Sequence, residues 1–79
     1  MKEIKGIRLS SAAEWGKLVR ATRKEQGISQ EQLAGVANVG VRFISDLENG
    51  KKTLQLDKAI LVLEALGLGA YAFNRWEMK

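Results

Sequence analysis

The sequence predicts an all-α protein, a compact bundle of four to five helices in a single domain. Apolar side chains recur at helical spacing in four segments. Serine or glycine precedes three of these segments, and glycine or asparagine follows each of the four. The chain has 79 residues, too few for a second hydrophobic core. With 46% hydrophobic residues and no proline, its composition is that of a globular chain rather than a disordered one.

The first two expected helices span residues 12–26 and 30–37. Ser11 and Ser29 each stand three residues before a glutamate or a glutamine. This is the capping-box pattern, in which the serine hydroxyl accepts a free backbone N–H and the later side chain reaches back. Asn38, which tolerates a positive φ, ends the second segment.

The next two expected helices span residues 41–48 and 56–66. The first of them follows Gly40 and ends where Asn49 is joined to another glycine. The later segment is apolar on more than one face, which favours a partner surface, most simply a second copy of the chain. We therefore assign Leu61 and Val62 to dimerisation; the alternative is that the C-terminal tail covers them.

Three parts are expected along the chain: an N-terminal arm (1–10), a domain (11–68) and a tail (69–79). Large and small side chains alternate in the tail, which predicts a short β-strand that pairs across a dimer; a loose tail is the alternative. The tail residues assigned to dimerisation are Tyr71, Phe73 and Trp76.

Charge is distributed unevenly. The net charge is +4 and the pI is about 9.7, which favours a polyanionic partner. Residues 1–28 hold seven basic and three acidic side chains, and residues 51–79 hold five and three, whereas residues 29–50 hold one and three. The chain is therefore not a simple polycation.

Several classes of function are excluded by composition. The sequence has no cysteine and no histidine, so disulfides, Cys/His zinc sites and catalysis by these residues are ruled out. Asp46 and Glu48 stand two apart on one expected helix and point in different directions. We expect no enzyme, no cofactor and no metal. No apolar run is long enough for a membrane span or a signal peptide, so a cytoplasmic protein is expected.

Two of the expected helices and the turn between them form a unit from Gln30 to Asn49, the size of a DNA-binding helix-turn-helix. Two longer runs carry a further signal: VRxxRKxxGISQxxLA beginning at Val19, and FISDLENGK beginning at Phe43. In these runs the chain resembles the lambda-repressor-like (Xre/Cro) helix-turn-helix family, most of all its HipB-type antitoxins.

The second helix of such a unit lies in the major groove, and its exposed first turn reads the bases. Arg42 can bond O6 and N7 of guanine together, and Val41 can contact a thymine methyl. Asp46 repels phosphates unless it accepts from cytosine or forms a local ion pair. The residues expected to read bases are Gly40, Val41, Arg42, Ser45 and Asp46.

We expect contacts with the phosphates of the DNA backbone at two places: the positive N-terminus of the 30–37 helix and the loop after the 41–48 helix. The residues assigned to phosphates are Ser29, Gln30, Asn49, Lys51 and Lys52. The resemblance also implies a partly buried ion pair between Arg23 and Glu48, which would orient the reading helix.

The resemblance implies a sequence-specific repressor that acts as a homodimer on a palindromic double-stranded operator. The likeness to HipB implies the antitoxin of a HipA-type toxin–antitoxin operon, with a Ser/Thr kinase as protein partner. The alternative is a protein-interaction module whose residues 56–66 and tail bind a partner, with only incidental contact to DNA.

Overall fold

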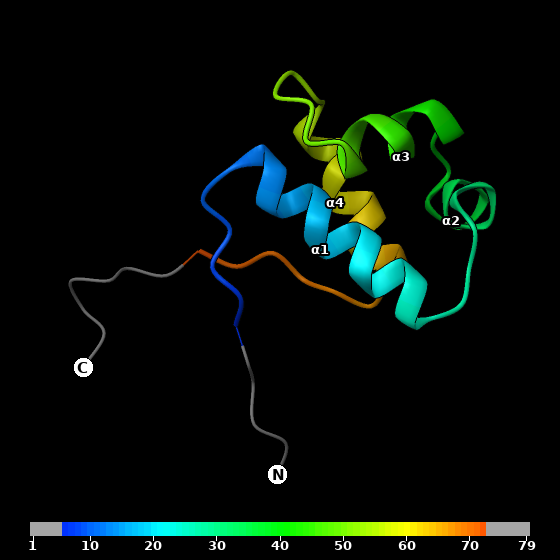
Figure 1. Cartoon of the computed structure of the whole chain (residues 1–79), viewed down its shortest axis with the longest axis horizontal. Helices are drawn as coiled ribbons and strands as arrows, with labels where there is room; N and C mark the ends of the chain where they lie inside the picture. The colour runs from blue at the N-terminus through cyan, green and yellow to red at the C-terminus, as the bar shows by residue number, and fades with distance from the viewer. Residues whose placement is uncertain (1–5, 73–79) are drawn as a thin grey trace, which may run out of the picture.

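The computed structural model describes residues 6–72 and contains four helices (Figure 1). They are α1 (Ala12–Glu25), α2 (Gln30–Ala37), α3 (Val41–Glu48) and α4 (Leu56–Ala65). The all-α prediction is confirmed, and each helix begins at the expected residue; α1 and α4 end one residue earlier than expected.

Helix starts follow local side-chain chemistry. Ser29 Oγ accepts the backbone N–H of Gln32 at 3.0 Å, and Gln32 Oε1 accepts that of Ser29 at 2.8 Å, so the second capping box is complete. At α1 the box is incomplete. Ser11 Oγ accepts the N–H of Glu14, but the Glu14 carboxylate binds Ser10 instead of reaching back to Ser11. Hydrogen bonds from the Ser10 backbone and hydroxyl lower the pKa of Glu14.

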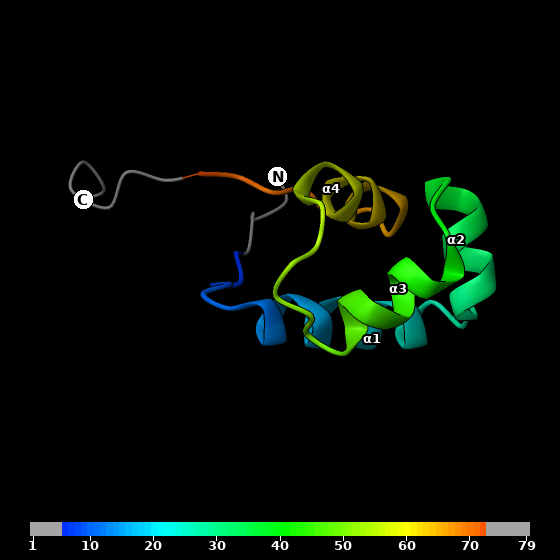
Figure 2. The same ribbon diagram turned by 90° about the horizontal axis from the view of Figure 1, so that it is seen from above.

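The helices enclose one small core. α1 and α3 pack against each other, α2 packs against both α3 and α4, and α4 lies on the opposite side of the molecule from α1 (Figure 2). The four largest fully buried side chains come one from each helix: Val19, Leu33, Ile44 and Val62. The core therefore closes only when all four helices are in place.

α4 uses its apolar faces differently from the expectation. Val62 is fully buried in the core, so its assignment to a dimer surface is wrong. Leu61, its neighbour in the chain, points about 100° away around the helix and is 44% exposed. The outer side of α4 thus carries Leu61 between two exposed charged residues, Asp57 and Glu64, and it does not include Val62.

The tail gives no support for a strand as far as it is described. Residues 68–72 have no regular secondary structure, and Tyr71 is 78% exposed. Phe73 and Trp76 lie outside the described residues. Within residues 6–72, no helix has the length and apolar character needed to cross a membrane.

Candidate functional site

α2 and α3 meet at a tight left-handed turn. Asn38 has φ 58° and ψ 47°, and the N–H of Val39 donates to the Ala34 carbonyl at 3.0 Å. Gly40 then begins α3 with extended backbone and has no side chain to cap the helix. The N-terminus of α3 therefore has no capping side chain, and because Gly40 is small another molecule can come close to the backbone there.

α3 has one face in the core and one face in solvent. Ile44 and Leu47 are buried, whereas Val41 and Arg42 are exposed on the other side. Ser45 and Asp46 stand one turn further along that outer side and are half-buried. The five residues predicted to read bases thus lie together on the outer side and tip of a helix whose inner side is anchored.

A charged network connects the ends of three helices. The Glu48 carboxylate accepts Arg23 Nε at 2.6 Å, Arg23 Nη2 at 3.0 Å and Gln30 Nε2 at 3.1 Å. Arg23 Nη1 donates to the Ile28 carbonyl at 3.0 Å. The expected Arg23–Glu48 pair is confirmed; the two side chains are only 11% and 3% exposed.

The network shifts both pKa values in the direction of the charged forms. Burial raises the pKa of Glu48, but the hydrogen bonds from Arg23 and Gln30 and the positive charges of Arg23 and Arg20 outweigh it, so that the pKa is lowered. The hydrogen bond to Glu48 raises the pKa of Arg23. Both groups stay ionised at neutral pH, and Glu48 holds the C-terminal end of α3 against α1 and α2.

The loop after α3 begins with a helix-ending motif that includes Lys51. Gly50, with φ 77°, donates its N–H to the Leu47 carbonyl at 3.1 Å, and Lys51 donates its N–H to the Asp46 carbonyl at 3.0 Å. This is the Schellman arrangement. Lys51 Nζ also lies 3.5 Å from Asp46 Oδ2, so Asp46 forms the local ion pair that was one of its expected alternatives.

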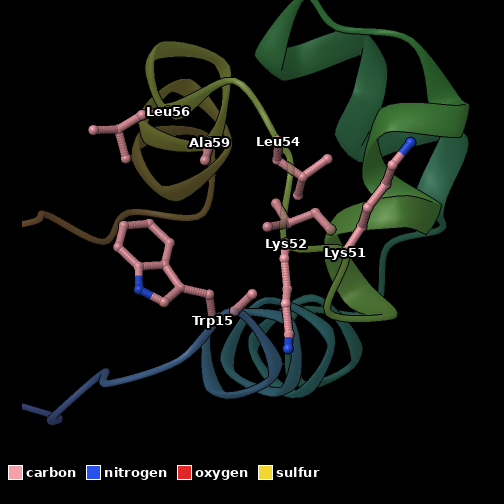
Figure 3. A pocket seen from close by; sticks show the side chains of 8 residues that line it. Trp15, Lys51, Lys52, Leu54, Leu56 and Ala59 are labelled. Atoms are coloured by element: carbon pink, nitrogen blue, oxygen red, sulfur yellow. The ribbon is translucent and has the colours of Figure 1, made fainter.

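The two loop lysines point in different directions (Figure 3). Lys51 extends away from α1, whereas the stem of Lys52 crosses toward α1 over an apolar hollow of about 220 Å³. The hollow is lined by Ala12, Trp15, Leu47, Leu54, Leu56 and Ala59 as well as the two lysine stems.

The partners in two contacts of this site were not predicted: Glu48 as the acceptor for Gln30, and Lys51 as the cation in the local ion pair of Asp46. The second had a readable signal. An asparagine–glycine helix end brings the residue after the glycine back over the last turn, here over Asp46.

Sequence comparison agrees with this geometry: the profile of the helix-turn-helix family matches residues 19–72, which include the C-terminal half of α1 and all of α2, α3 and α4. The chain belongs to the helix-turn-helix family of DNA-binding transcription regulators. This helix-turn-helix chain is 55% identical over 60 residues to the uncharacterized HTH-type transcriptional regulator y4mF of Sinorhizobium fredii. The match covers 76% of the chain and 79% of that relative.

Solved structures share the fold. The HipB–O4 20mer complex matches with a TM-score of 0.79 and 20% sequence identity over 89% of this helix-turn-helix chain and 99% of the HipB chain. The HipA–HipB–O2–O3 complex matches with a TM-score of 0.80, the same identity and the same coverage. The lambda-repressor-like resemblance is confirmed, and at this identity the structural likeness concerns the fold.

Proposed function

We propose that the protein is a sequence-specific transcriptional repressor that binds a palindromic operator as a homodimer. The observation that carries this proposal is the division of α3: Ile44 and Leu47 hold its inner side in the core, while Val41 and Arg42 stand exposed on its outer side. A helix held in this way can enter the major groove as a rigid unit.

Base reading is assigned to the outer residues of α3. The Arg42 guanidinium donates to O6 and N7 of a guanine, and Val41 packs on a thymine methyl. Ser45 donates to or accepts from a base edge, Asp46 accepts from a cytosine amino group, and the bare backbone at Gly40 allows close approach.

Phosphate contacts flank α3 on both sides. Gln30 donates one amide hydrogen to Glu48 and keeps the other for a phosphate oxygen at the N-terminus of α2, beside Ser29. On the other side, the DNA backbone is contacted by three residues that follow α3: Asn49, Lys51 and Lys52. Gln30 is hydrogen-bonded to Glu48 at the end of α3, so a contact between Gln30 and a phosphate also positions α3 on the DNA.

The dimer face is placed on the outer side of α4. Leu61 on that side is 44% exposed, a large apolar side chain that a second copy would cover. Tyr71, Phe73 and Trp76 are assigned to the same interface. A two-fold dimer places two reading helices roughly 34–36 Å apart, one turn of B-DNA, and doubles the number of base pairs read.

An antitoxin role is part of the proposal. It is supported by the fold shared with HipB, which has been solved together with HipA. The partner is then a HipA-type kinase. We expect a gene for a HipA-type kinase beside this one, and co-expression of the two proteins should inhibit phosphoryl transfer by the kinase; unchanged kinase activity would refute the antitoxin role and leave the repressor role intact.

The repressor role is tested by selecting duplexes from a random pool with the purified protein and sequencing them. The expected product is a palindrome whose half-sites are about 10 base pairs apart, centre to centre. If the protein binds the selected duplexes no more tightly than random duplexes of equal length, it is an interaction module rather than a repressor.

A further inference from the structure

We propose that Asp46 is a specificity-determining residue because it holds the phosphate-binding lysine of the loop, Lys51, in an ion pair that every DNA duplex must break. The inference rests on the proposed repressor function. It goes beyond that function by assigning to Asp46 the rejection of non-operator DNA.

The two residues are joined twice. Besides the 3.5 Å contact between Lys51 Nζ and Asp46 Oδ2, the Lys51 N–H donates to the Asp46 carbonyl at 3.0 Å. The main-chain bond belongs to the helix end at Gly50 and fixes where the lysine side chain begins. Lys51 can therefore turn its ammonium from the carboxylate to a phosphate by rotating side-chain bonds, without any movement of the backbone.

The pair is open to solvent on the outer side of α3. The Lys51 side chain is 51% exposed and that of Asp46 is 30% exposed. Asp46 stands four residues after Arg42, on the same side of the helix, so a duplex that meets Arg42 also meets the carboxylate. Exposed pairs of this kind are weak, and DNA phosphates can exchange with the carboxylate as the partner of Lys51.

The result of the exchange depends on the DNA sequence. On a random duplex, Asp46 loses its cation and faces phosphates and base-edge acceptors, so the carboxylate is repelled. On the operator, a cytosine amino group replaces the lysine as hydrogen-bond donor. The lost ion pair is thus compensated on the operator alone, and Asp46 weakens non-specific binding more than specific binding.

The test is a double-mutant cycle with Asp46→Asn, Lys51→Ala and the double variant. Affinity is measured by fluorescence anisotropy at 50 mM salt, on the duplex selected by the wild-type protein and on a random duplex of the same length. On the operator, asparagine frees Lys51 but replaces a charge-assisted hydrogen bond to cytosine with a weaker neutral one, so operator affinity should rise by less than about twofold. Affinity for the random duplex should rise about fivefold, and the operator-to-random ratio should fall by a similar factor.

The cycle separates the ion pair from simple repulsion. Asp46→Asn should raise the affinity for the random duplex about two- to fivefold more when Lys51 is present than in the Lys51→Ala background. In that background the substitution only relieves the repulsion between the carboxylate and the DNA. Glu25→Gln, the same change of charge at an exposed position on α1, should leave both affinities unchanged. Thermal melting of each variant confirms that it is folded.

Two results would overturn the inference. One is that Asp46→Asn raises the affinity for the random duplex equally with and without Lys51; the other is that it raises the affinity for the operator as much as that for the random duplex. A wild-type operator-to-random ratio near one would instead refute the proposed function itself.

Discussion

Gly16 of α1 lies directly against the main-chain carbonyl of Leu47 in the last turn of α3. A Cβ atom at this glycine would stand 2.7 Å from the carbonyl oxygen of Glu48, closer than such atoms pack. The backbones of the two helices therefore touch at this point. The absence of a side chain on α1 sets how closely the reading helix is held to the scaffold.

This contact reverses the usual effect of a glycine-to-alanine change in a helix. Alanine is favoured by about 1 kcal/mol in a helix interior, but Gly16→Ala should lower the free energy of unfolding by about 1–3 kcal/mol, because α3 must move. Gly35→Ala is the matched control: nothing lies within 4 Å of its Cβ position, so it should be stabilising. Urea unfolding of both variants checks the prediction; stabilisation by both would contradict the contact.

Glu48→Ala should be strongly destabilising, because it leaves the Arg23 guanidinium, 11% exposed, without its partner. Loss of one member of a buried pair costs about 3–5 kcal/mol, which should lower the melting temperature by more than about 10 °C. Glu25→Ala, at an exposed position near the end of α1, is the control and should melt like the wild type.

The same carboxylate should make stability depend on pH. The pKa of Glu48 is lowered below its ordinary value of 4.5 in the folded protein, so the unfolded chain takes up the proton first on acidification. The stabilisation by Glu48 is complete above about pH 4.5 and is lost as the pH falls through the lower folded pKa. Melting from pH 7 to pH 3 should show a decline that Glu48→Gln reduces; parallel curves for the two proteins would be inconsistent with it.

Arg42→Ala should weaken the preference for the selected sequence without altering stability. Arg42 is exposed on α3 and its removal leaves the core intact, so the melting temperature should stay within about 2 °C of the wild type. Loss of a bidentate contact to guanine should cost about 1–3 kcal/mol for each half-site on the selected duplex and little on a random one. Anisotropy titrations on both duplexes measure this. Lys17→Ala, which also removes one exposed positive charge but from α1, should keep the preference.

Neighbouring residues on α4 should respond in opposite ways to substitution. Leu61→Asp puts a charge on the exposed face and should yield a folded monomer with weak operator binding, seen by sedimentation. Val62→Ala opens a cavity in the core and should lower stability by about 2 kcal/mol without changing the oligomeric state at equal folded concentration. A Leu61→Asp protein that still sediments as a dimer would place the interface elsewhere.

Much of the fold could be predicted from the sequence because its signals are local. Capping serines, helix-ending glycines and apolar spacing lie within a few residues of one another, and they located all four helices from Ala12 to Ala65. The turn at Asn38 between two short helices was enough to indicate the helix-turn-helix. The Arg23–Glu48 pair came from resemblance to a family and not from spacing, because its members are 25 residues apart.

Only the tertiary structure decided which side of each helix is buried and which is exposed. Helical periodicity places Leu61 and Val62 about 100° apart, but it does not say which of the two meets α2 and the core. Nor does it distinguish Gly16, pressed against α3, from Gly35, which has open space around it. Each of these outcomes depends on atoms supplied by a distant segment, so no window of neighbouring residues contains it. By itself the sequence determined where the helices begin and end; packing determined which side chains remain free to meet DNA or a second copy.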